Sequence, residues 1–241
     1  MTASDLLPEA APVERRLETP RAAGAAGIAF ALLFVASILL LRNQPAGAST
    51  ATEIRDFYLG EHAGRVALVG IYLVPFSGIA FLWFIAVIRN MLADREDRFF
   101  ATVFLGSGLL FVAMLFLAAG AGGALLVAVK FQDEPVPSAD SVVLVRSIGF
   151  GFLFIYAMRM AAVFMIVVST IAVRLGVFPR WLVVAGYLAA LVLMLNVSYA
   201  ETLILVFPAW VAAVSLVILR TGPPTTPVGN APVLPDGKLK P

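Results

Sequence analysis

Long apolar runs separated by short polar segments are the main pattern along this chain. A helix crosses the hydrocarbon core of a bilayer, about 30 Å thick, with about 20 mostly apolar residues, because each residue adds about 1.5 Å. The pattern therefore predicts an all-α fold, a polytopic transmembrane bundle of six helices. We expect its spans at about residues 24–41, 66–88, 99–129, 147–173, 181–197 and 203–219.

Composition supports one membrane domain flanked by two tails. Hydrophobic residues make up 61% of the chain and charged residues only 13%, whereas charged residues are about 25% of a soluble domain. The domain covers residues 21–220, and the proline-containing tails at 1–20 and 221–241 are expected to be disordered. Six spans place both tails on one side, which carries most of the loop arginines and lysines, so both termini are predicted to be cytoplasmic.

The first loop, residues 42–64, has two notable features. The small residues Ala46-Gly47-Ala48 form a site of the kind that signal peptidase accepts, but the long acidic tail before the first run favours an uncleaved span. The spacing of Thr50 and Glu53 is that of a capping box. We therefore expect a short amphipathic helix on the outer membrane surface, ended by Gly60 in a left-handed turn.

Proline and glycine interrupt the longer apolar runs. Pro75 removes a backbone donor from the second span and predicts a kink there. The run at residues 99–129 is too long for one straight crossing, so it forms either one long helix or a broken one. Ala118 and Gly122 have the spacing that lets two membrane helices pack closely; the glycines near them are compatible with a bend as well.

Arg159 is the most costly residue in the apolar runs, because it falls near the middle of the span between Arg146 and Arg174. A guanidinium at the bilayer centre costs about 2.5–3.5 kcal/mol on insertion scales. We expect it to face the protein interior, as a site for an anionic ligand or lipid head group or as a structural arginine that ties helices together. A tilt or break at Gly149 or Gly151 would instead bring it nearer an interface.

The candidate neighbours of Arg159 are polar residues of the adjacent spans. They are Tyr72, Ser77, Tyr156 and Asn196, together with carbonyls freed at Pro75. Glu201 is a further carboxylate in the last short turn, although it is expected near the interface.

A second cluster of polar chemistry lies in the first outer loop, at Glu53, Asp56, Glu61 and His62. Carboxylates and an imidazole can bind a metal or transfer protons. The spacing matches no metal motif, and charge on a surface helix usually faces solvent. Glu61 and His62 are therefore only weak candidates for a metal site.

Residue counts exclude several function classes. The chain has no cysteine and a single histidine, so thiolate chemistry, iron–sulfur clusters and a haem between two protein histidines are excluded within it. Its lysines, Lys130, Lys238 and Lys240, lie at span ends or in a tail, which argues against a retinal Schiff base. With no nucleotide or nucleophile motif and a net charge of +2, we expect no enzyme, no cofactor and no nucleic-acid partner.

Several segments of the chain resemble bacterial membrane proteins, in two groups. Residues 21–41, the string GVFPRW at 176–181 and the span containing Gly186 resemble a broad group of uncharacterised six-span bacterial proteins. Residues 80–89 and the string EDRFFAT at 96–102 resemble actinobacterial membrane proteins. The resemblance implies a multi-pass protein of the bacterial plasma (inner) membrane and implies no chemistry.

Three hypotheses for function follow. The first is a small transporter, channel or lipid binder that holds an anionic ligand at Arg159. The second is an accessory or scaffold subunit that packs against a membrane-protein partner or another copy of itself. The third is an outward-facing metal or acid–base site at Glu61 and His62.

Overall fold

The computed structural model describes residues 19–41, 50–92, 98–132, 134–195 and 201–221. The tripeptide Ala46-Gly47-Ala48 lies outside these ranges. So do most residues of the two expected tails, 1–20 and 221–241. The described elements are all helical: α1 (Thr19–Leu41), α2 (Ala51–Leu59), α3 (Glu61–Leu68), η2 (Val69–Leu73), α4 (Val74–Leu92), α5 (Arg98–Phe131), α6 (Ala139–Phe150), η4 (Gly151–Ala157), α7 (Met158–Leu175), α8 (Arg180–Leu195), η5 (Glu201–Leu205) and α9 (Val206–Thr221).

Five helical segments of the described chain are long and apolar enough to cross a membrane: Gly24–Leu41, Ala63–Arg89, Phe99–Phe131, Ala139–Leu175 and Thr202–Arg220. These helices confirm an all-α protein and fit a multi-pass membrane protein. The expected span at 181–197 corresponds to α8, which has 16 residues. At about 1.5 Å per residue it is shorter than the hydrocarbon core, so a sixth crossing stays a prediction.

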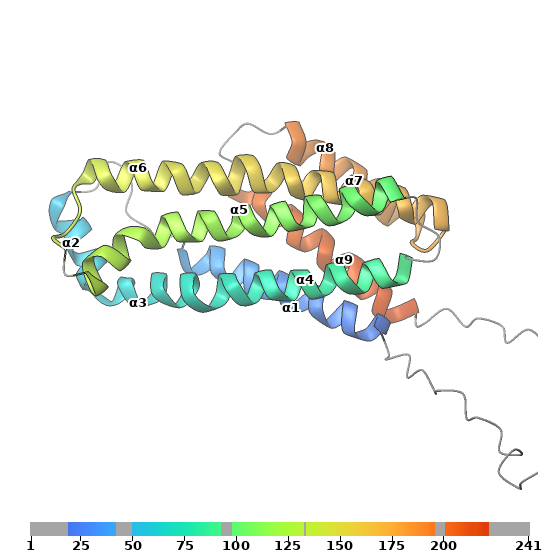
Figure 1. Ribbon diagram of the computed structural model, residues 1–241, viewed down its shortest axis with the longest axis horizontal. Coiled ribbons are helices and arrows are strands. Elements are labelled where there is room, and N and C mark those ends of the chain that lie inside the picture. The colour runs from blue at the N-terminus through green and yellow to red at the C-terminus, as the bar shows by residue number, and fades with distance from the viewer. Residues whose placement is uncertain (1–18, 42–49, 93–97, 133, 196–200, 222–241) are drawn as a thin grey trace, which may run out of the picture.

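The first and last helices pack antiparallel. Gly24 of α1 lies against Leu219 of α9, and Gly27 lies against Ser215. The start of α1 and the end of α9 are therefore at the same end of the bundle, opposite to α2 (Figure 1). An even number of passes requires this arrangement, while the cytoplasmic location of that end stays a prediction.

The long third run forms one unbroken helix. α5 extends for 34 residues from Arg98 to Phe131 in spite of its glycines. A Cβ at Gly149 of α6 would lie 3.3 Å from the Ala118 carbonyl oxygen and 3.8 Å from the Gly122 nitrogen. These small residues therefore let α5 and α6 approach closely, as their spacing predicts.

Two π-helical segments interrupt the long helices. η2 ends at Leu73, two residues before Pro75, so the disturbance predicted at this proline takes the form of a wider helical turn. η4 begins at Gly151 and connects α6 to α7 without a break. The segment 139–175 starts earlier than expected because the Ser138 hydroxyl caps α6, accepting from the Ser141 amide at 3.3 Å.

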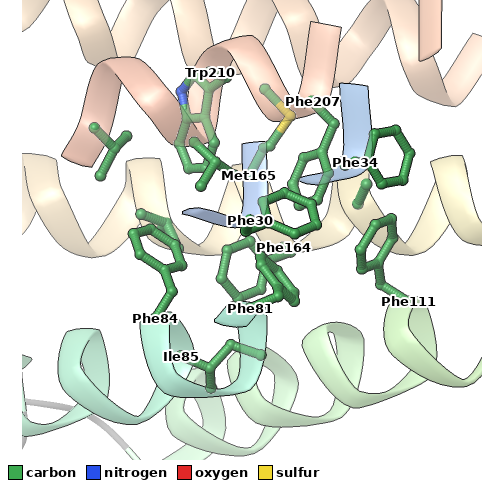
Figure 2. Packing of buried hydrophobic residues seen from close by; sticks show 14 of the residues in the cluster. Phe30, Phe34, Phe81, Phe84, Ile85, Phe111, Phe164, Met165, Phe207 and Trp210 are labelled. Atoms are coloured by element: carbon green, nitrogen blue, oxygen red, sulfur yellow. The ribbon is translucent and has the colours of Figure 1, made fainter. Parts of the chain in front are cut away.

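Phenylalanine rings from five helices form the centre of the bundle (Figure 2). Phe81 of α4 is fully buried. Its ring centroid lies 4.7 Å from that of Phe30, 5.1 Å from Phe111 and 5.3 Å from Phe164. The ring of Phe207 lies 5.5 Å away. These contacts join α1, α4, α5, α7 and α9 at one point.

The short helix α2 has the predicted capping box, since the Thr50 amide donates to the Glu53 carboxylate at 2.7 Å and the Glu53 amide to the Thr50 hydroxyl at 3.3 Å. Ile54 and Tyr58 are buried in a small cluster with residues of α3, α5 and α6. The apolar face of α2 therefore packs on protein instead of lying free on a lipid surface. Its location outside the membrane stays a prediction.

The predicted left-handed turn at Gly60 is wrong. Gly60 has φ −85° and ψ −168°, an extended conformation. The reason is that Gly60 both ends α2 and precedes α3, and an extended residue redirects the chain between two helices that follow each other directly. Among the described glycines, a positive φ occurs at Gly176, the C-cap of α7.

Candidate ligand cavity

A cavity of about 300 Å³ lies between α1, the α3–η2–α4 segment, α5, the α6–η4 segment and η5. We call it the inter-helix cavity. Both π-helical segments of the described chain border it, η2 through Val69 and Gly70 and η4 through Leu153 and Phe154. Because π-helical turns widen a helix locally and are frequent at functional sites, their meeting at one cavity marks a candidate site.

The walls of the inter-helix cavity are mainly apolar. Leucine, valine, phenylalanine and small residues such as Ala118 and Gly122 form most of them. Gly122 leaves open space where a Cβ would be, so the glycines that α5 carries beside this site contribute volume to it. The large side chain of Phe34, which is buried in the aromatic core, closes one part of the wall.

Four polar side chains line the cavity: Ser37, Ser77, Thr202 and Arg146. The Ser37 hydroxyl donates to the Leu33 carbonyl at 2.7 Å, and the Ser77 hydroxyl donates to the Phe30 carbonyl at 3.5 Å. Both hydroxyl protons are therefore used within the bundle, and only the oxygen lone pairs can face a ligand.

Arg146 supplies the positive charge of the cavity. It belongs to α6, lines the cavity and is at the same time exposed, so this residue borders both the cavity and the outside of the bundle. A guanidinium binds carboxylate and phosphate oxygens through two parallel hydrogen bonds. An apolar chamber with this group at its edge can hold an amphipathic molecule with an anionic head.

Arg159, the residue that the sequence marks most strongly, does not line this cavity. It is partly exposed, and its Nη1 donates to the Ile155 carbonyl of η4 at 3.0 Å. The Met158 amide donates to the same carbonyl. The bond from Arg159 lies within the arginine's own helical segment, so it does not tie two helices together. Ligand binding at Arg159 stays a prediction.

The structure does not bring the other predicted neighbours of Arg159 together around one cavity. Ser77 is buried and lines the inter-helix cavity. Tyr72 and Tyr156 are 53% and 56% exposed and do not line it. Asn196 lies outside the described residues.

Metal binding in the first loop is likewise untested. The side chains of Glu61 and His62 lie outside the described part of the structure. Among the residues that were described, no group of three histidine or acidic side chains lies close enough together to hold a metal ion.

Arg146 is the residue that reasoning from sequence missed. Its position in the sequence predicts only the ordinary place of an arginine at the end of a span. The available signals are Pro75, which follows the η2 segment that borders the cavity, and Gly122 and Gly123 of α5, which line it. Neither pattern alone shows that the two irregular segments face each other.

The fold fits a helical, multi-pass membrane protein, and its apolar chamber has an arginine at its edge. No protein-family model, no curated protein and no solved structure matches this chain. The resemblance to six-span bacterial membrane proteins therefore stays a prediction.

Proposed function

We propose that this protein binds an amphipathic ligand with an anionic head group in the inter-helix cavity. The observation that carries the proposal is the meeting of both π-helical segments, η2 and η4, at a chamber that Arg146 borders. The chamber's volume of about 300 Å³ is at the lower end of the range for ligand sites, about 300–1,000 Å³. Acyl or other apolar groups would fill the chamber, and the head group would bind the guanidinium.

The polar groups in the chamber favour binding or transport over catalysis. Ser37 and Ser77 donate to backbone carbonyls, whereas the hydroxyl of a serine nucleophile donates to the base that activates it. A carrier or binder needs only a shaped apolar site and a group that fixes the head. We place the protein in a bacterial inner membrane as part of the same proposal.

Charge substitution at Arg146 tests the proposal. The wild-type protein, purified in mild detergent with added phosphatidylglycerol, should retain this lipid in native mass spectra in preference to phosphatidylcholine. Arg146→Gln should lower the retention at least tenfold, since the loss of one charge-assisted hydrogen bond weakens binding by about 1.5–3 kcal/mol and about 1.4 kcal/mol is a factor of ten.

Two arginines provide matched controls. Arg174 lies at the opposite end of the bundle, with its guanidinium carbon 4.4 Å from the Phe100 ring centroid, so Arg174→Gln removes the same charge far from the cavity. Arg159→Gln tests the site predicted from sequence. Equal retention by the wild type and Arg146→Gln would refute the proposal, and a loss confined to Arg159→Gln would move the site to that residue.

A second candidate function, an accessory subunit of a membrane complex, is favoured by the surface around Arg159. This partly exposed cation lies next to Ile155 and Tyr156, which are 41% and 56% exposed. A carboxylate on a partner helix would offset the cost of a cation within the membrane. Purification in mild detergent should then recover a stoichiometric partner that Arg159→Gln loses, and a clean monomer would argue against this function.

A further inference from the structure

A second pocket, of about 320 Å³, lies between the α3–η2–α4 segment and α5. We call it the side pocket. It shares five lining residues with the inter-helix cavity: Val66, Gly70, Val74, Ala119 and Gly123. These five residues therefore form a common wall between the two spaces.

The common wall is thin where glycine forms it. Nothing lies within 4 Å of the position that a Cβ would take at Gly70 or at Gly123. The first of these glycines belongs to η2 and the second to α5, so at both places the wall is backbone alone, with open space beside it.

The other side of the side pocket faces outward. Ile71, Phe116 and Phe131 line it and are 54%, 42% and 71% exposed. They belong to two of the segments that are long and apolar enough to span a membrane. Every residue that lines this pocket is apolar, glycine or proline, so it suits an acyl chain and disfavours a hydrated anion.

We propose that the ligand of the inter-helix cavity is a bilayer lipid with an anionic head group, and that its chain enters sideways through the side pocket between η2 and α5. The inference rests on the proposed function and adds the ligand's source and route. The apolar pocket takes the chain from the hydrocarbon, and the positive charge of Arg146, at the edge of the cavity, holds the head group.

Substitutions at three glycines of α5 can distinguish an effect on ligand entry from an effect on ligand binding. Gly120 lines only the side pocket, Gly122 lines only the inter-helix cavity, and Gly106 lines neither. All three have nothing within 4 Å of a Cβ position. Leucine at each site therefore has room at the backbone and gains helix propensity over glycine.

The experiment uses phosphatidylglycerol with a diazirine on its acyl chain, delivered from vesicles to the protein in phosphatidylcholine liposomes. Photolysis at successive times gives the loading rate, and long incubation gives the final occupancy, both read as adducts on the cavity residues Leu115 and Leu153. Gly120→Leu should slow loading about tenfold, a barrier increase of about 1.4 kcal/mol, without changing the final occupancy. Gly106→Leu should change neither quantity.

A second variant of the side pocket keeps the test decisive if Gly120→Leu misfolds. Val127 lines the side pocket but not the cavity and is 45% exposed, so Val127→Phe should slow loading in the same way. Loading of Gly120→Leu and Val127→Phe at the wild-type rate would overturn the lateral route and leave cavity binding in place. Gly122→Leu should lower the final occupancy, and a wild-type cavity without adducts would overturn the proposed function itself.

Discussion

Phe81→Ala should be among the most damaging single substitutions in the bundle. The side chain is fully buried, and its ring lies within 6.0 Å of five other phenylalanine rings. In a membrane, removing the ring loses no hydrophobic transfer free energy, because lipid is as apolar as the core. The cost is therefore the cavity that the truncation leaves.

The size of that cavity sets the expected magnitude. Phenylalanine exceeds alanine by about 100 Å³, and about 24 cal/mol per Å³ of unfilled cavity gives about 2.4 kcal/mol. Loss of the edge-on ring pairs with Phe111 and Phe207 adds to this, at about 0.5–1.5 kcal/mol for each aromatic pair. We expect Phe81→Ala to lower the free energy of unfolding by about 3–5 kcal/mol.

The assay is reversible unfolding by SDS in mixed micelles, followed by circular dichroism. Phe76 is the matched control, because it lies on the same helix but is 55% exposed. Phe76→Ala should change the free energy of unfolding by less than about 0.5 kcal/mol. Equal losses for the two variants, or a loss below 1 kcal/mol for Phe81→Ala, would refute a packed aromatic centre.

Two further experiments test other contacts. A Cβ at Gly186 would overlap the Ser169 hydroxyl and lie 2.9 Å from Trp210 Nε1, so Gly186→Ala should destabilise the bundle by about 1–3 kcal/mol in the same assay, whereas Gly106→Ala, in open space, should be neutral or slightly stabilising. Burial raises the pKa of Tyr58 above its ordinary value of 10.0, so the neutral phenol contributes stability that is fully present below pH 10 and is lost as the pH rises through the raised pKa. Hydrogen exchange of α2 should accelerate above about pH 10 in the wild type beyond the base-catalysed increase seen in Tyr58→Phe; identical pH dependence would contradict this.

Hydrophobic pattern and local capping predicted much of the fold. The apolar runs placed five of the helical segments, and the spacing of Thr50 and Glu53 predicted a capping box that the structure contains. Both signals work because they depend on residues close together in sequence. The expected span at 181–197, by contrast, extends past Leu195 into residues that the structure does not describe, so the sixth crossing stays a prediction.

The candidate site was less accessible to reasoning from sequence. The sequence marks Arg159 because a charged side chain in the middle of an apolar run is costly to insert into a membrane. The proposed role of Arg146 depends on α6 bordering the same cavity as α1 and the α3–η2–α4 segment, a long-range relation that one sequence does not show. The glycines at residues 120, 122 and 123 all lie in α5, and nothing lies within 4 Å of a Cβ position at any of them, although the backbone of Gly122 is close to Gly149 of α6. The sequence pattern does not show which side of a glycine packs closely and which borders open space.

The length of α5 has a consequence for the surrounding lipids. α5 has 34 residues, which is about 51 Å of helix at about 1.5 Å per residue, whereas the hydrocarbon core of a bilayer is about 30 Å thick. A helix of this length crosses a bilayer only if it leans or if the lipids beside it stretch. Long-chain lipids would therefore collect along α5.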